Sequence, residues 1–585
     1  METKACQNCH TNFEIAPEDF VFYEKMKVPP PTFCSRCRLQ RRLSWANLRS
    51  LYQRKMPDGK TAISMYAQDK PYNIIPDKDW WSADHDLTKY GQGYDFNRSF
   101  FEQFDGLMKQ VPLPHLQRNF STFENSDYCN AASYLKNCYL VMAADNSENV
   151  SYSYSVEEVK DSLDLLFTNK SELCYECINV KRSYRCFFCK DIEDCNELIF
   201  SEDCVGCNNC FGCFGLRNKS FQIFNKQYSK EEYATRLKEL NIKSFVNCEN
   251  LKQEAQKNFL SRPHQFMRGR NNDNVSGDYI YQSKNVHDSF IVEQGENCRF
   301  CETLRYFNGG TKDAYDYSIF GCNAELVYES VWCGLGVSNV RFSIWNYGST
   351  DLQYCFGCHS SQELFGCIGL RKKKFCILNK QYSQEEYNDL VPKIIEQMKT
   401  HPHKDSANRI YSYGEFFPVE LSPFDYNETL SQDFLPLTVK ESEKAGYGWH
   451  EMSARTAKPD VSWKDLPDTI AEVKDDLVGR LILCKAFDED ENKAVAHNCT
   501  KVFKIIAQDL AFYRRMGLPL PRCCPNSRHA FRVGTLSMKN YSRKCVCQQT
   551  GHEHNGTCAI QFITNYSPDR PEIVYCEKCY QAEVV

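Results

Sequence analysis

The chain has 585 residues, 33 of them cysteine, and its 71 basic and 76 acidic side chains leave a net charge of −5. This near balance excludes a protein that binds nucleic acid or anionic lipid through its overall field. No apolar run approaches the roughly 18 residues of a membrane span, and the start METKACQNCH lacks a signal-peptide core. We therefore expect a cytoplasmic protein with no membrane partner, whose closely spaced cysteines bind metal rather than form disulfides.

Residues 1–60 predict a zinc ribbon with a basic flank. Two Cys-x-x-Cys pairs, Cys6/Cys9 and Cys34/Cys37, stand at the two ends of the segment 6–37. Four thiolates on two tight turns are the tetrahedral ligand set of structural zinc.

The ribbon also carries a resemblance, through Cys-x-x-Cys, a Phe-Tyr pair, a proline and Cys-x-x-Cys-Arg. Residues 4–42 resemble a short bacterial zinc-ribbon family. The whole chain resembles large cysteine-rich zinc-ribbon proteins of candidate-phylum bacteria, through this start, Trp80-Trp81, the NKQYS-x-EEY segments and the VYCEKCY ending. The resemblance implies zinc binding and no particular activity.

A basic run follows the second cysteine pair and is interleaved with Trp45 and Tyr52. Arginines beside aromatic rings suit phosphate contact and base stacking, so the run predicts a contact with RNA or DNA. The alternatives are a solvated helix face or pairing with local acids. The predicted nucleic-acid-binding residues are Arg36, Arg38, Arg41, Arg42, Arg49, Arg54 and Lys55.

After an aromatic-rich connection at 61–120, residues 121–262 and 272–400 predict two related halves. GCFGLRNKSFQIFNKQYSKEEY at 212–233 returns as GCIGLRKKKFCILNKQYSQEEY at 366–387. In each copy a Ser-x-x-Glu capping box, Ser229/Glu232 and Ser383/Glu386, predicts a closing helix.

Within these halves every twelfth position belongs to one recurring series, whose members often follow Asn or Asp. The members are Ser126, Cys138, Val150, Ser162, Cys174, Cys186, Leu198, Cys210 and Gln222, and, less evenly, Val286, Cys298, Val340, Leu352, Leu364 and Cys376. A fixed short period of this kind predicts a β-solenoid. The period fits one very small coil or half of a coil twice as long, and the aromatic residues in each period favour the longer coil. The alternative is a set of small metal knuckles without a sheet.

The cysteines of the predicted solenoid are expected to form an inert core ladder, with extra metal sites or disulfides as alternatives. Residues 401–475, with scattered proline and glycine and the segment SPFDYNETLSQDFLPL, predict an extended linker.

Residues 476–585 predict a second zinc-ribbon-like module, because 499–528 align with 9–38 without a gap. Cys499, Cys524 and Arg528 match Cys9, Cys34 and Arg38. Where Cys6 and Cys37 would fall, the module has Ala496 and Ser527, and the candidate replacement ligands are Cys484, His497, Cys523 and His529.

A separate zinc site is predicted at the C-terminus from Cys545, Cys547, Cys558, Cys576 and Cys579. The Cys576/Cys579 pair needs two partners, which we expect to be Cys558 and either Cys545 or Cys547. The N-terminal copy has Met56 near the Cys545 position and no terminal knuckle, so its second site is expected to be lost. The chain should bind two or three Zn²⁺.

The fold prediction is thus a mainly β protein, a duplicated β-solenoid with a 12-residue period and capping helices, flanked by zinc-ribbon modules. No nucleotide-binding loop or hydrolase motif is present, so no catalytic residue is predicted. The leading interpretation is a non-enzymatic zinc-binding scaffold that contacts nucleic acid or a nucleoprotein complex through its terminal modules. The alternatives are an enzyme acting on a carbohydrate or acyl substrate in a solenoid groove, and a pure protein-interaction scaffold.

Overall fold

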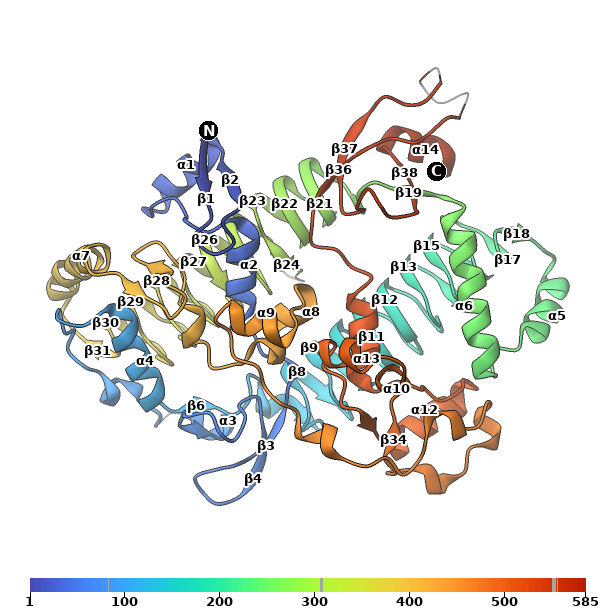
Figure 1. The fold of residues 1–585 in the computed structure, drawn as a ribbon, viewed down its shortest axis with the longest axis horizontal. Coiled ribbons are helices and arrows are strands. Elements are labelled where there is room, and N and C mark those ends of the chain that lie inside the picture. The colour runs from blue at the N-terminus through green and yellow to red at the C-terminus, as the bar shows by residue number, and fades with distance from the viewer. Residues whose placement is uncertain (83, 306–308, 550–553, 555, 585) are drawn as a thin grey trace. The chain divides into compact units, whose positions relative to one another are not determined.

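The computed structural model describes residues 1–82, 84–305, 309–549, 554 and 556–584, and it is mainly β (Figure 1). The chain divides into two compact units, each made of separate stretches. Unit 1 comprises Met1–Leu116, Met267–His450 and Met538–Asn540, and unit 2 comprises Gln117–Phe266, Glu451–Ser537 and Tyr541–Val585. Each end of the chain therefore shares a unit with the central half that is more distant in sequence. Among the described residues, none of the helices has both the length and the apolar character that crossing a bilayer requires.

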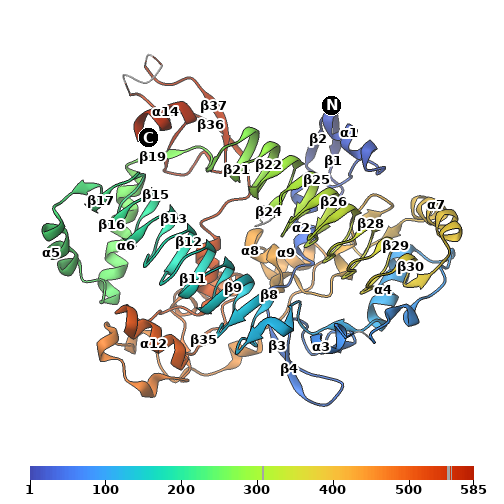
Figure 2. The ribbon, with the colours of Figure 1, turned by 180° about the vertical axis from the view of Figure 1, so that it is seen from behind.

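The centre of unit 2 is a series of short parallel strands, here called the first stack (Figure 2). Hydrogen-bonded partners in neighbouring strands follow a 12-residue spacing, as in Leu163↔Tyr175 and Ile178↔Lys190. Its strands are β7 (Phe123–Glu124), β8 (Asn130–Lys136), β9 (Met142–Ser151), β10 (Tyr154–Glu157), β11 (Lys160–Asn169), β12 (Tyr175–Lys181), β13 (Lys190–Glu193), β14 (Asn196–Ile199), β15 (Glu202–Val205), β16 (Asn208–Phe211) and β17 (Ser220–Ile223).

Unit 1 contains the second stack, which is also parallel. About half of the partners keep the same 12-residue spacing, as in Leu352↔Leu364. Partners are 13 residues apart between β25 and β26 and between β26 and β27, as in Ala314↔Val327, and 16 residues apart between β23 and β25, as in Cys298↔Ala314. Its strands are β20 (Gly269–Arg270), β21 (Asp273–Tyr281), β22 (Lys284–Glu293), β23 (Gly295–Arg299), β24 (Glu302–Leu304), β25 (Thr311–Ser318), β26 (Ala324–Val331), β27 (Val337–Arg341), β28 (Thr350–Gln353), β29 (Gln362–Phe365) and β30 (Lys374–Ile377).

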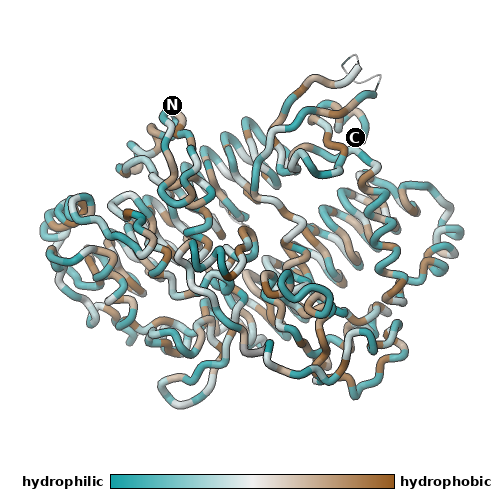
Figure 3. The backbone as a smooth tube through the Cα atoms, viewed as in Figure 1, coloured by the Kyte–Doolittle hydropathy of each residue, from teal (hydrophilic) through white to brown (hydrophobic). Residues whose placement is uncertain are grey.

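In the first stack about every third residue is buried in the core. Hydrophobic and hydrophilic residues therefore alternate at short intervals along the backbone (Figure 3). Every position that the repeating pattern identified between Ser126 and Gln222 is buried. One run of buried residues with this spacing is Cys174, Cys177, Val180, Ser183, Cys186, Cys189, Ile192, Cys195 and Leu198. Small and medium-sized side chains from successive periods therefore lie over one another in the interior.

The aromatic residues of the first stack lie in a different core from these small residues. Tyr152, Phe187 and Phe200 belong to a cluster that includes Phe512 and Tyr513 of the C-terminal module. The argument that aromatic side chains need the room of a longer coil is therefore wrong, because these rings pack against other elements outside the stack.

The backbone turns at regular intervals through residues in the left-handed conformation. The residues that precede the repeating position include Asn125, Asn137, Asn149 and Asp161, with φ of 48°, 51°, 54° and 48°. Asparagine and aspartate tolerate this conformation better than other non-glycine residues. Their side chains also form a ladder, in which Asn125 Nδ2 donates to Asn137 Oδ1 at 3.0 Å and Asn137 Nδ2 donates to Asn149 Oδ1 at 3.1 Å.

Serine and cysteine suit the interior because they are small and bond with inward-facing backbone groups. Ser162 Oγ accepts a hydrogen bond from the Cys174 N–H at 2.9 Å, and Cys177 Sγ donates to the Cys186 carbonyl at 3.3 Å. Burial raises the pKa of Cys129 to about 12, so this thiol stays protonated at neutral pH. None of the described cysteines forms a disulfide, which was one of the two alternatives to a core of inert thiols.

Each stack ends in the repeated NKQYS segment, which forms a hairpin and then a helix. In the first stack β18 (Lys226–Gln227) folds back on β17, and in the second β31 (Lys380–Gln381) folds back on β30. The predicted capping boxes are confirmed, because Ser229 and Glu232, and likewise Ser383 and Glu386, exchange side chain-to-backbone hydrogen bonds. The helices are α5 (Lys230–Leu240) and α6 (Phe245–Leu260) after the first stack and α7 (Gln384–Thr400) after the second.

The N-terminal module of unit 1 starts with a hairpin and two short helices and continues through further small elements. These are β1 (Glu2–Ala5), β2 (Asn12–Ile15), α1 (Pro17–Lys25), α2 (Ser35–Leu43), β3 (Tyr52–Lys55), β4 (Thr61–Ser64), β5 (Ile74–Ile75), α3 (Asp77–Trp80), α4 (Phe100–Gln110) and β6 (Leu113–Pro114).

The C-terminal module of unit 2 follows the same order with inserted helices. Its elements are β34 (Ile482–Leu483), α10 (Lys485–Glu489), α11 (Glu491–Ala496), β35 (Val502–Phe503), α12 (Ala507–Met516), α13 (Pro525–Val533), β36 (Tyr541–Lys544), β37 (Gln561–Thr564), β38 (Ile573–Tyr575) and α14 (Glu577–Val584). Strand β38 also pairs with β19 (Pro263–Gln265).

Residues 401–475, predicted as an extended linker, are folded. The part up to His450 belongs to unit 1, where Phe416 and Phe417 are fully buried. Aromatic side chains anchor this irregular segment, so its proline and glycine mark turns rather than a free connection. Its regular elements in unit 1 are β32 (His403–Lys404), β33 (Ile410–Tyr411), α8 (Leu430–Phe434) and α9 (Val439–Lys444).

The interior of the stack yields a first prediction. Cys186→Leu adds volume to a fully buried position and should lower the free energy of unfolding by about 1–3 kcal/mol, whereas Cys186→Ser should change it much less. Tyr184→Leu, at a 44% exposed position nearby, is the matched control. Urea unfolding of the purified variants measures the difference, and a Cys186→Leu protein as stable as the wild type would contradict this packing.

Candidate metal centres

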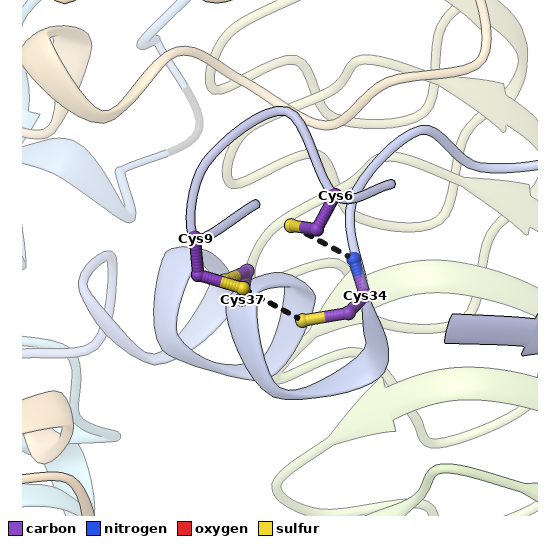
Figure 4. Close-up of side chains that lie close together, drawn as sticks. All are labelled: Cys6, Cys9, Cys34 and Cys37. Atoms are coloured by element: carbon purple, nitrogen blue, oxygen red, sulfur yellow. Dashed lines mark hydrogen bonds between the residues drawn. The ribbon is translucent and has the colours of Figure 1, made fainter. Parts of the chain in front are cut away.

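The first candidate metal centre is formed by the four predicted cysteines of the N-terminal ribbon. Cys6 and Cys9 lie in the turn between β1 and β2, Cys34 is the N-cap of α2, and Cys37 lies in the first turn of that helix. Their side chains converge on one point (Figure 4). The four sulfur atoms all lie within 4.8 Å of one another, so this group could hold a metal ion.

The spacing of these sulfurs suits a tetrahedral ion. Cys9 Sγ lies 3.7 Å from Cys34 Sγ, and the Cys34 N–H donates to Cys6 Sγ at 3.3 Å. Four zinc–sulfur bonds of about 2.3 Å at tetrahedral angles would place sulfurs about 3.8 Å apart. Hydrogen bonds from the Cys34 and Cys37 thiols lower the pKa of Cys6 well below its ordinary value, which favours the thiolate form that a metal needs.

The second candidate centre, in the C-terminal module, contains three cysteines. Cys499 and Cys524, both predicted, lie with Cys484 within the same 4.8 Å limit. Cys524 Sγ is 3.6 Å from Cys499 Sγ, and Ser527 Oγ is 3.3 Å from Cys524 Sγ. Ser527 Oγ also lies 3.7 Å from Cys484 Sγ, so a hydroxyl stands beside two of the three thiols, and the Cys523 thiol contacts Cys484 as well.

Cys484 takes the place of Cys6, although the ungapped alignment puts Ala496 there. The Cys524 N–H donates to Cys484 Sγ at 3.2 Å, the same hydrogen bond that Cys34 makes to Cys6. Helices α10 and α11 are inserted between Cys484 and Cys499, so the first two ligands no longer share one tight turn. The other candidate replacements, Cys523, His497 and His529, lie outside this group of three.

The third candidate centre is at the C-terminal end of unit 2. Cys545, Cys558, Cys576 and Cys579 form a buried group with all four sulfurs within 4.8 Å of one another. The Cys576 N–H donates to Cys545 Sγ at 3.3 Å, and Cys558 Sγ lies 3.9 Å from Cys576 Sγ. The structure therefore brings Cys545, rather than Cys547, together with the other three.

Cys547 belongs to a neighbouring group that the sequence did not suggest. Its sulfur, a His554 nitrogen and Cys579 Sγ also lie within 4.8 Å of one another, and His554 Nε2 is 3.3 Å from Cys579 Sγ. Cys579 is common to both groups. A lone histidine in a polar loop gives little sequence signal, which is why this ligand was missed.

The N-terminal module has a corresponding hairpin and helix, but different residues occupy the ligand positions. Met56 follows β3 as Cys545 follows β36, and Pro76 and Asp79 stand at the start of α3 where Cys576 and Cys579 stand at the start of α14. Met56 and Trp80 are buried, and Asp77 Oδ1 lies 3.1 Å from His115 Nε2. The thiol cluster of the C-terminal copy is replaced here by apolar packing and a polar pair.

The arginines of α2, predicted to bind nucleic acid, are buried against the second stack. Arg38 Nη2 lies 2.8 Å from one carboxylate oxygen of Asp316, and Arg42 Nη1 lies 2.9 Å from the other. Arg41 Nη2 lies 2.9 Å from Glu329 and 3.0 Å from Glu415. Arg38, Arg41 and Arg42 are at most 1% exposed. Their assignment to nucleic acid is therefore wrong, because acidic side chains already occupy these three guanidinium groups.

The remaining basic residues of the run are dispersed. Arg54 is buried and donates to the carbonyls of Ala67, Lys70 and Tyr72, so it too serves the fold. Arg36 and Lys55 are exposed, and Arg49 is partly exposed. The continuous basic surface expected from the sequence is thus reduced to three of its seven members.

Unit 2 contains the same arginine–aspartate arrangement. Arg528, aligned with Arg38, and Arg532, one helical turn further on, both contact Asp164 on β11, with N–O distances of 3.0 Å. Asp164 is fully buried, as is Asp316. In each unit a helix that starts at a metal-centre cysteine places two arginines on one buried aspartate of the stack.

No family model matches the chain, and no curated protein matches it. One solved structure with a partial likeness comes from Desulfovibrio desulfuricans G20 and is described as a "putative acetyltransferase". The aligned residues are 10% identical and cover 50% of this chain and 74% of that one, with a TM-score of 0.12. A likeness of this size assigns neither a fold nor an activity.

Substitutions can test the fourth ligand position of the first and second centres. Ser527→Cys gives the second centre four thiols and should tighten its metal binding roughly tenfold or more, while Cys37→Ser should weaken the first centre by a similar factor. Competition with a zinc-sensitive chelator dye measures both. Equal metal affinity before and after Ser527→Cys would show that Ser527 does not occupy a ligand position.

The buried aspartates yield a matched pair of variants. Asp316→Asn and Asp164→Asn each remove the charge that compensates two buried guanidinium groups, so each should cost about 3–5 kcal/mol of stability. Glu158→Gln removes an exposed partner of Lys170 and should cost less than about 1 kcal/mol. Urea unfolding midpoints decide the matter, and aspartate variants no worse than Glu158→Gln would refute the arginine–aspartate role.

Proposed function

We propose that the protein is a non-enzymatic zinc-binding scaffold. The chemistry of the donor sets supports zinc, since three- and four-sulfur groups on tight turns at tetrahedral spacing are typical of structural zinc sites. Each centre anchors a helix or hairpin of an end module. The proposed role of the metal is to fix the shape of these modules rather than to carry out a reaction.

In this proposal each stack is a β-solenoid with one coil per 12-residue period, and the two units arose by duplication. The 12-residue register between successive strands, in the first stack and in part of the second, supports the short coil. The matching positions of Arg38 and Arg528, and of the two NKQYS hairpins, support the duplication. A solenoid of this kind is rigid because every coil bonds to the next, which suits a spacer or recognition surface.

The observation that carries the proposal is that each ribbon is joined to its stack through buried charge. The helix that begins at Cys34 contacts Asp316, and the helix that begins at Cys524 contacts Asp164. Losing the metal would loosen the start of each helix and leave buried charges misplaced. Metal binding and the integrity of each unit are therefore coupled.

The placement of the basic residues argues against the predicted nucleic-acid partner. Four of the seven basic residues serve the fold, and Arg49 Nη1 lies 3.9 Å from Asp433 Oδ1. Only Arg36 and Lys55 of the seven are exposed. Along the first stack, several outer charges pair with the next period, including Lys190 with Glu202 at 3.4 Å and Arg185 with Glu197 at 3.4 Å. Opposite charges paired in this way stabilise the stack. A carbohydrate-cleaving enzyme would instead use a pair of carboxylates.

Removal of the metal tests the proposal. Protein purified under reducing conditions should contain three zinc ions per chain by elemental analysis, and chelation should lower Tm and expose the end modules to protease. Cys34→Ser should lose one ion, whereas Cys174→Ser in the first stack should retain all three. A metal-free protein with unchanged Tm and protease resistance would overturn the proposal.

A second measurement separates the partner classes. Binding of mixed RNA or DNA that falls steeply between about 50 and 200 mM salt and is lost on combined Arg36→Ala, Arg49→Ala and Lys55→Ala substitution would establish nucleic acid as the partner. We expect no such binding. The triple variant should instead behave as the wild type in both stability and metal content.

A further inference from the structure

A cavity of about 390 Å³ lies within unit 1, between the N-terminal ribbon and the second stack. This volume is in the range of small-molecule sites, which occupy about 300–1,000 Å³. Its wall combines apolar side chains, among them Phe13, Ile15 and Phe290, with charged and polar groups. The lining residues come from the ribbon, from the segment β22 to β24, from Met538–Asn540 and from Leu435 at the end of α8.

The two arginines in the interior of the wall are already neutralised. Arg299 Nη1 lies 2.8 Å from Asp19 and its Nη2 lies 3.2 Å from Asp288, so one guanidinium group faces two carboxylates. Arg38 is held by Asp316, as described above. The other two cations of the lining, Arg36 and Lys539, are exposed to solvent. The buried part of the wall therefore offers no unpaired positive charge.

Two oxygen atoms, which belong to lining residues of the cavity and are themselves buried, accept no hydrogen bond from the residues that the structure describes. They are Glu302 Oε2 and Asn540 Oδ1, and Glu302 is only 1% exposed. Asn540 is oriented by its own amide, since Nδ2 donates to Asp288 Oδ1 at 3.3 Å. A buried acceptor without a donor costs about 1–3 kcal/mol, so such a group calls for a partner.

We infer that this cavity binds a small organic cation, a primary amine or guanidinium with an apolar body, whose N–H groups donate to Glu302 and Asn540. A ligand of this class supplies both things that the interior of the wall lacks, hydrogen-bond donors and positive charge. Its apolar body packs against Phe290 and Ile15. An anion would find the guanidinium groups of Arg38 and Arg299 already paired.

The ionisation of Glu302 agrees with this assignment. Burial raises the pKa of Glu302 to about 7, against the opposing effects of the Thr303 hydroxyl and the Arg42 charge. Near neutral pH the carboxyl is therefore close to its midpoint, and a cation beside it would favour the carboxylate form.

Calorimetry on the full-length, zinc-loaded protein tests the inference with three probes of one shape. Benzylamine should bind, whereas benzyl alcohol and benzoate should bind at least about tenfold more weakly because they lack the charge or reverse it. Benzoate binding as tightly as benzylamine, or no heat from any of the three, would overturn the proposal.

Variants locate the site. Glu302→Gln should weaken benzylamine binding by about tenfold or more, and Asn540→Ala by a smaller factor. Glu14→Gln, at an exposed carboxylate of the cavity wall, is the control and should change binding less than about twofold. If Glu302→Gln fails to fold, as judged by zinc content and Tm, Asn540→Ala decides alone. Unchanged affinity in the folded variants would refute the site.

Discussion

One buried aspartate in each unit fixes the position of an end module. A carboxylate and two guanidinium groups removed from water are tolerated only when they meet at close range, so helix α2 has one position on the second stack and α13 one on the first. The first and second metal centres lie at the start of these helices, and the unit 1 cavity is bounded by the same arginine–aspartate contact. Asp316 therefore determines where the first metal centre and the cavity lie on the second stack, and Asp164 determines where the second metal centre lies on the first stack.

The sequence predicted the features that depend on residues close together in the chain. Cys6, Cys9, Cys34 and Cys37 converge because ligand spacing on two tight turns is a local property, and the 12-residue period marks the buried positions of the first stack. The coil length could not be decided in the same way, because a sequence does not show whether an aromatic residue faces the interior or a neighbouring element. Tyr152 and Phe200 face the latter.

The remaining predictions failed where the structure depends on pairing between residues that are far apart in the sequence. An arginine can bind a phosphate or a buried carboxylate equally well. The carboxylate that pairs with Arg42 is 274 residues away in the sequence, so it could not be identified from the basic run itself. Cys484 was one of four candidates, because an insertion of two helices moved it out of the register in which Cys6 stands. His554 and the cavity acceptor Glu302 belong to no motif, so only the folded chain brings them to their partners.

The order of the segments along the chain also has a consequence for synthesis. Arg42 is made 274 residues before Asp316, and Asp164 is made 364 residues before Arg528. At roughly 5–20 residues per second, the first ribbon waits about 15–55 s for its acidic partner, and the first stack waits longer still for its arginines. During that interval a set of unpaired arginines and a bare stack face are both exposed on the nascent chain. The early folding of the ribbon around its own metal would keep that segment compact until its partner emerges from the ribosome.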